Sequence, residues 1–156
     1  MITGDIIKYF DEAIKVEINA SNMYALFSRK FPEDKLFWWS LSIEEMNHAS
    51  LIESEKLFYE VNVFPEELFS TDLEELIKIN DSFYLKMKEF KNNPTMETAF
   101  KIALEIENSA VELDYQKLAE STKSGRAVKL FKDLNRADKD HAKRIMDYMS
   151  KKGKIE

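Results

Sequence analysis

The sequence contains no cysteine among its 156 residues. This absence excludes disulfides, cysteine-bound zinc, iron–sulfur clusters and thiol nucleophiles. A chain of this length can bury most of its apolar surface without such cross-links. We therefore expect one domain over residues 1–156, stabilised by an ordinary packed core.

Long apolar runs are absent as well. No stretch approaches the roughly 20 apolar residues that cross a bilayer, and residues 1–15 lack the basic and apolar segments of a signal peptide. We expect a cytoplasmic protein with no membrane partner. The formal net charge is −6, and nucleic acids select basic stripes, so no nucleic-acid partner is expected either.

Glycine and proline are scarce, with three of each, so the chain has few turns and must build long elements. Apolar residues spaced by three and four predict four long helices, at about 4–29, 34–59, 95–121 and 126–150. The connection over 62–94 is too long for a tight turn, and its amphipathic part at 72–90 predicts a short extra helix. Two short links and one long link predict an all-α four-helix bundle with a single crossover.

The chain also repeats itself. Residues 13–17 (AIKVE) match residues 103–107 (ALEIE), a shift of 107 − 17 = 90. Residues 41–49 (LSIEEMNHA) match residues 134–142 (LNRADKDHA), with a shift of 141 − 48 = 93 between their histidines. Two helix pairs related by a nearly constant shift predict a duplicated hairpin. Equivalent side chains should then lie on either side of a pseudo-two-fold axis.

Each predicted helix carries an inward apolar stripe that becomes polar at one level. The polar residues at this level are acids and the only two histidines of the chain: Glu17, Glu45, His48, Glu107, Asp138 and His141. Both histidines follow an acid by three residues. On a helix, residues three apart share a face and lie about 4.5 Å apart along the axis, so each such pair can bind one metal ion.

Burial of these acids decides between two interpretations of the pattern. An ionised carboxylate in a dry interior costs several kcal/mol, and no lysine or arginine lies on the stripes at this level to neutralise it. Two divalent cations balance four carboxylates. Oxygen-rich ligands with one imidazole per metal favour two iron ions, or manganese or a mixed pair, over structural zinc. The other interpretation is a set of solvated surface residues.

Neighbouring residues leave the ligand set open. Three acids replace the chosen ligands if the stripes are rotated: Glu44, Glu105 and Asp140. Three residues beyond the ligand level are candidates for contacting the ligands from outside, although a core aromatic is the simpler role for the tyrosines: Tyr24, Asp114 and Tyr115. A second apolar edge on the second predicted helix indicates a homodimer interface: Trp39, Ile43 and Met46.

Over nearly its whole length the chain resembles the rubrerythrin branch of the ferritin-like di-iron carboxylate proteins. The motifs that carry the resemblance are AIKVE at 13–17, EMNH at 45–48, ALEIE at 103–107 and DKDH at 138–141. The resemblance implies a ferritin-like bundle with three kinds of ligand: the single glutamates Glu17 and Glu107, the bridging acids Glu45 and Asp138, and the terminal histidines His48 and His141.

Three features depart from the rubrerythrin pattern. Ala110 stands where the family usually has a second glutamate, one turn after the ligand of the third helix. Asp138 stands where the family usually has glutamate, so its reach is shorter. Because the sequence contains no cysteine, we expect no rubredoxin-like iron domain of the kind that full rubrerythrins carry. Electrons must therefore come from an external donor, such as a rubredoxin-like protein.

From the resemblance we expect an oxidoreductase that reduces peroxide or dioxygen at a carboxylate-bridged di-iron centre, with ferroxidase-type chemistry. No catalytic residue separate from the metal ligands is expected. One alternative is a non-catalytic protein that buffers or senses iron. Another is a helical bundle that serves only as an oligomerising partner.

Overall fold

The computed structural model describes residues 3–61, 73–112 and 126–153, with side chains placed for 6–57, 73–109, 129–130 and 132–153. The described residues form helices and no strands, which confirms the all-α prediction. The elements in chain order are α1 (Thr3–Lys30), the short 3₁₀ helix η1 (Pro32–Asp34), α2 (Lys35–Val61), α3 (Leu73–Asn92), α4 (Met96–Glu112) and α6 (Arg126–Lys152).

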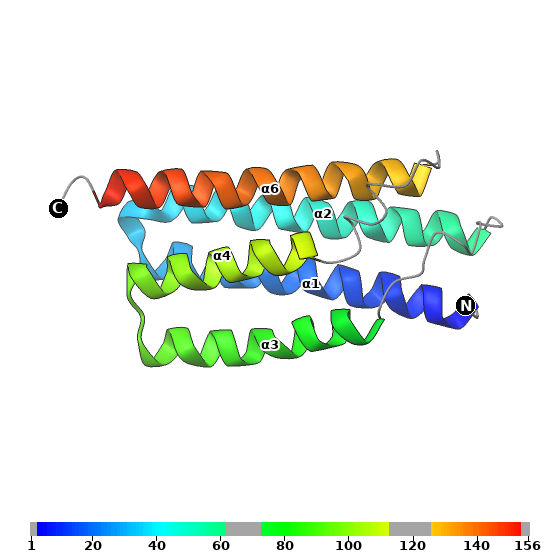
Figure 1. The fold of residues 1–156 in the computed structure, drawn as a ribbon, viewed down its shortest axis with the longest axis horizontal. Helices are drawn as coiled ribbons and strands as arrows, with labels where there is room; N and C mark the ends of the chain where they lie inside the picture. Colours follow the sequence, from blue (N-terminus) through cyan, green and yellow to red (C-terminus); the bar gives the residue numbers. More distant parts are fainter. Residues whose placement is uncertain (1–2, 62–72, 113–125, 154–156) are drawn as a thin grey trace.

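The helices lie side by side along the long axis of the molecule (Figure 1). Helices α1 and α2 are antiparallel neighbours joined through η1, and α4 packs against α6, also antiparallel. Helices α2 and α4 run in the same direction, so α3 returns the chain between them. Helix α3 packs against α1 and α4 and lies far from α2 and α6 in Figure 1. Residues 73–90 of the predicted amphipathic segment lie in α3 and are helical.

Local sequence signals explain several helix ends. The hydroxyl of Thr95 accepts a hydrogen bond from the backbone N–H of Thr98 at 3.1 Å, so Thr95 caps the start of α4. Pro32 stands in the first turn of η1, where its missing N–H costs nothing. These short links join α1 to α2 and α3 to α4.

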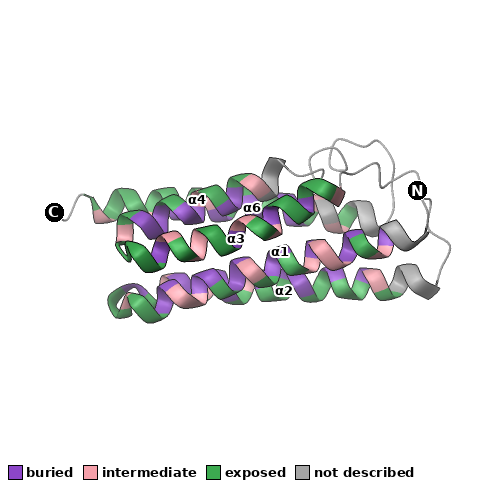
Figure 2. Cartoon of the chain, turned by 90° about the horizontal axis from the view of Figure 1, so that it is seen from below, coloured by how far each residue is buried: buried purple, intermediate pink, exposed green. Residues whose placement is uncertain are grey.

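The buried faces of the helices point towards one another (Figure 2). Wherever the structure places their side chains, the apolar residues central to the predicted stripes are buried: Phe10, Ala13, Trp38, Leu41, Ile52, Phe100, Ala103, Leu134 and Ile145. Aromatic rings fill one end of the core, where Trp38 stacks on Tyr24 with ring centroids 6.0 Å apart. The Ser21 hydroxyl also donates to the Ser42 carbonyl at 2.8 Å, which fixes the register of α1 on α2.

The second apolar edge lies on the surface of α2. Trp39, Ile43 and Met46 are each 45% exposed, and the neighbouring Leu36 is 83% exposed. None of the described helices combines the length and apolar character that crossing a membrane requires.

A buried acid connects η1 to the end of α6. The Asp34 carboxylate is 5% exposed and accepts a hydrogen bond from the Tyr148 hydroxyl at 2.5 Å. Lys152 Nζ lies 2.6 Å from the same oxygen, and the Tyr148 ring stacks on Phe37 at 3.9 Å between centroids. This cluster joins the first hairpin to the last helix.

We expect Asp34→Ala to lower the free energy of unfolding by about 1–3 kcal/mol, because the Tyr148 hydroxyl loses its buried acceptor. Urea denaturation followed by circular dichroism measures the change. Asp133→Ala is the control, since Asp133 is exposed and 3.6 Å from Arg136, and such surface pairs contribute less than about 1 kcal/mol. Equal losses in both variants would contradict a stabilising role for the Asp34 cluster.

Candidate metal centre

Four helices contribute polar side chains to one level of the core. Helix α1 provides one acid, α2 an acid and a histidine, α4 one acid, and α6 an acid and a histidine. All six residues that the sequence singled out are buried, with whole-residue exposed fractions between 1% and 9%: Glu17, Glu45, His48, Glu107, Asp138 and His141. The interpretation as solvated surface residues is therefore wrong for these positions.

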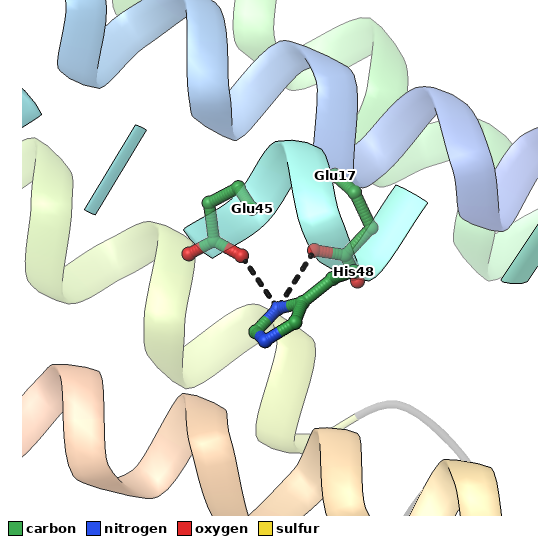
Figure 3. A group of neighbouring side chains, drawn as sticks. All are labelled: Glu17, Glu45 and His48. Atoms are coloured by element: carbon green, nitrogen blue, oxygen red, sulfur yellow. Dashed lines mark hydrogen bonds and ion pairs between the residues drawn. The ribbon is translucent and has the colours of Figure 1, made fainter. Parts of the chain in front are cut away.

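The first group of potential ligands joins α1 to α2. The imidazole of His48 lies between the carboxylates of Glu17 and Glu45 (Figure 3). Its Nδ1 is 2.9 Å from Glu45 Oε2 and 3.7 Å from Glu17 Oε2. One ligand atom from each residue lies within 4.8 Å of the other two, a spacing that a single metal ion can bridge.

The second group joins α2 to α4 and α6. The Nδ1 of His141 is 2.9 Å from Glu45 Oε1 and 3.6 Å from Glu107 Oε2. Glu45 thus belongs to both groups and turns one oxygen towards each histidine. The two imidazole rings are nearly parallel, at 17°, with centroids 5.5 Å apart. Asp138, the counterpart of Glu45 in the sequence repeat, belongs to neither group, so the two groups meet at Glu45 alone.

Two buried carboxylate oxygens in the cluster are left without a hydrogen-bond partner among the described residues: Glu17 Oε1 and Asp138 Oδ2. No lysine or arginine of the described residues forms an ion pair with any of the four buried acids of the cluster. Buried polar oxygens without partners are rare in proteins because each one costs free energy. Four acids, two of which have an unpaired oxygen, and two imidazoles form a donor set that fits two divalent cations.

The acids of the cluster are held partly as neutral groups. Burial raises the pKa of Glu17 to about 8 and that of Glu107 to about 7. Burial and the charge of Glu17 also raise the pKa of Asp138 well above its usual range. These groups keep protons where charge is not otherwise balanced.

The histidines and Glu45 are shifted in the opposite sense, towards their charged forms. Burial opposes ionisation of Glu45, but hydrogen bonds from His141 and His48 outweigh it and lower the pKa of Glu45 to about 2. Burial likewise opposes charge on the histidines. Hydrogen bonds to Glu17 and Glu45 nevertheless raise the pKa of His48 to about 10, and those to Glu107 and Glu45 raise that of His141 to about 11. Protons on the five groups other than Glu45 occupy the places that cations can take.

Two residues contact the cluster from outside. The Tyr24 hydroxyl donates a hydrogen bond to Glu107 Oε1, so Tyr24 is both a core aromatic and a partner of a candidate ligand. Glu44 Oε2 lies 3.0 Å from His141 Nε2, on the far side of the ring from Glu45. Arg144 donates to both oxygens of Glu44, at 2.7 and 3.0 Å, and lowers the pKa of Glu44.

The three alternative acids do not join the two candidate groups. Glu44 contacts the outer nitrogen of His141, whereas the side chains of Glu105 and Asp140 are 44% and 61% exposed. The position of Glu44 beside His141, where Arg144 holds its carboxylate, was not predicted from the sequence. The available signal was position, because Arg144 follows His141 by three residues and can reach a partner of that ring. Asp114 and Tyr115 lie outside the described residues, as does the side chain of Ala110.

Comparison with known proteins leaves the family of the chain open. No protein-family model matches the sequence, and neither a curated protein nor a solved structure shows significant similarity to it.

We expect the metal-free protein to lose stability as pH rises from about 5 to 9. Glu17 and Glu107 have ordinary pKa values near 4.5 and folded values of about 8 and about 7, so the unfolded chain ionises first and alkaline pH favours it. The contribution of the histidines is complete below their ordinary pKa of 6.5 and is lost as pH rises towards 10 and 11. Glu45 acts at the acid end, where its contribution is lost as pH falls from 4.5 towards 2.

Thermal unfolding of chelator-treated protein across this pH range tests the expectation. Saturating Co²⁺ should reverse the trend, because metal displaces the protons and binds more tightly as pH rises. A metal-free melting temperature that stays constant from pH 5 to 9 would contradict the proposed charge state of the cluster.

Proposed function

We propose that the chain is a rubrerythrin-like di-iron oxidoreductase that reduces peroxide or dioxygen. The single observation that carries this proposal is Glu45, which is buried and shared between two groups that each contain a glutamate and a histidine. One carboxylate facing two imidazoles is the arrangement that holds two metal ions close together. A site for one structural ion needs no such shared acid.

The fold supports the same proposal. We propose that α1, α2, α4 and α6 form a ferritin-like four-helix bundle, and that α3 belongs to its single crossover connection. The parallel direction of α2 and α4, with α3 between them in sequence, supports this topology. Two antiparallel helix pairs would then face each other across the acids, and each pair would supply one histidine.

The charges favour two divalent ions. Four carboxylates carry −4 and two Fe²⁺ ions carry +4, so the loaded site is formally neutral. Glu17 and His48 would hold one iron, and Glu107 and His141 the other. Glu45 and Asp138 would bridge the two ions; the unpaired Oδ2 of Asp138 supports that role. Manganese or a mixed pair fits the same donors.

Reduction of one H₂O₂ to two H₂O requires two electrons and two protons. A pair of ferrous ions held by these glutamates and histidines would supply the two electrons. The chain contributes the surroundings: burial below 10% exposure keeps bulk water from the ligands, and Tyr24 orients Glu107 through its hydrogen bond. An external donor such as a rubredoxin-like protein would return the ferric site to the ferrous state. We also propose a cytoplasmic homodimer that pairs through the edge formed by Trp39, Ile43 and Met46.

Anaerobic loading with Fe²⁺, followed by H₂O₂, tests the reaction. We expect two irons per chain and rapid loss of peroxide with appearance of ferric absorbance. Glu45→Ala should reduce the rate by at least about 100-fold, the upper end of what removal of a mere ligand partner costs. Glu105→Gln is the matched control, because it alters an exposed glutamate on α4 and should leave the rate unchanged.

Two other outcomes separate the alternatives. Two bound irons that consume peroxide no faster than free Fe²⁺ would indicate an iron buffer or sensor, which the missing second glutamate at Ala110 would then explain. No bound iron in the wild-type protein would leave only a helical scaffold.

A further inference from the structure

The two halves of the candidate metal centre differ outside the ligands. The shift of 93 residues that relates His48 to His141 also relates Glu44 to Ala137 (44 + 93 = 137). The same shift relates Leu51 to Arg144 (51 + 93 = 144). Glu44 and Arg144 lie near His141. At the equivalent positions near His48, the repeat has Ala137 in place of the acid and Leu51 in place of the arginine.

The outer side of His141 is fully bonded. Its Nε2 is 3.0 Å from Glu44 Oε2, and Arg144 holds the Glu44 carboxylate with two hydrogen bonds. Arg144 also reaches Ser40, at 3.3 Å, so α6 and α2 are connected by charged groups at this point. The His141 ring therefore has a fixed orientation, with its Nε2–H donated outward and its Nδ1 directed at Glu45. Its side chain is only 1% exposed.

His48 has no corresponding support. Its contacts are made through Nδ1, and within the described residues no side chain meets its Nε2. Its side chain is 11% exposed, against 1% for His141.

We propose that the two metal positions are unequal, and that the position of Glu107 and His141 binds first and more tightly because Glu44 and Arg144 fix its imidazole. The position of Glu17 and His48 is the weaker one, and its ion exchanges with solution. This inference rests on the proposed two-metal site. A carboxylate bonded to the outer nitrogen of a ligand histidine fixes the ring and raises its basicity, and losing such a partner typically costs 10- to 100-fold in metal affinity.

Occupancy at one equivalent of metal tests the order directly. Crystals of metal-free protein mixed with one equivalent of Co²⁺, measured at the cobalt absorption edge, should show the stronger anomalous peak between Glu107 and His141. Position is the decisive readout, because repulsion between two cations makes the second step weaker in any paired site. A stronger peak beside His48, or equal peaks, would overturn the inference.

Calorimetric titration with Co²⁺ at neutral pH tests the cause. Glu44→Gln should weaken the first binding step by 10- to 100-fold and leave the second unchanged. Asp140→Asn is the matched control: it removes the same charge from a residue 3.6 Å from Arg144 without touching His141, and it should change neither step. The double variant A137E/L51R should strengthen the second step, because it supplies His48 with the same pair of groups.

The outcomes separate this inference from the proposed function. Two bound Co²⁺ ions with a first step that Glu44→Gln leaves unchanged would overturn the role of Glu44 while the two-metal site stands. A wild-type protein that binds no Co²⁺ would overturn both.

Discussion

Four carboxyl groups and two imidazoles occupy one level of a core whose largest fully buried side chains are aromatic and aliphatic. Removing several ionised acids from water is unfavourable by far more than a typical hydrogen bond returns. The folded chain therefore needs positive charge at this level, either as protons on the acids and imidazoles or as metal ions. Glu45 is the centre of this balance, because both histidines direct Nδ1 at its carboxylate.

The remainder of the structure keeps this level closed and in register. Trp38 and Tyr24 stack beside it, and the bond from Ser21 to Ser42 aligns α1 with α2 about one turn away from Glu17 and Glu45. A helical hairpin used twice gives each histidine its own acid at a spacing of three. Only contact between the two hairpins lets Glu45 serve both histidines. The sharing of the Glu45 carboxylate therefore depends on tertiary packing, because the second histidine belongs to the other hairpin.

Much of the fold and the ligand level could be predicted because helical periodicity is a strong signal. An acid such as Glu17 is unexpected at a position where the helical spacing calls for an apolar core residue. Six acids and histidines in such positions at one level indicate a common cause. The choice between Glu44 and Glu45 follows from the same spacing rule, since only Glu45 stands three residues before His48. Sequence spacing cannot specify contacts between helices. The pairing of Glu44 with His141 and Arg144, nearly 100 positions away in the chain, depends on the rotation of α6 against α2.

The difference between the surroundings of His141 and those of His48 can be understood from the repeat. A duplicated hairpin begins with two equivalent halves, and the proposed reaction, which takes up both electrons and protons from outside, gains nothing from keeping them identical. One half can hold its ion rigidly through an outer carboxylate, while the other half stays nearer to solvent. The chain has this division, with Glu44 and Arg144 behind His141 and Ala137 and Leu51 behind His48. A site that only stores iron gains less from such a difference than a redox site in which one ion stays bound and the other exchanges with solution.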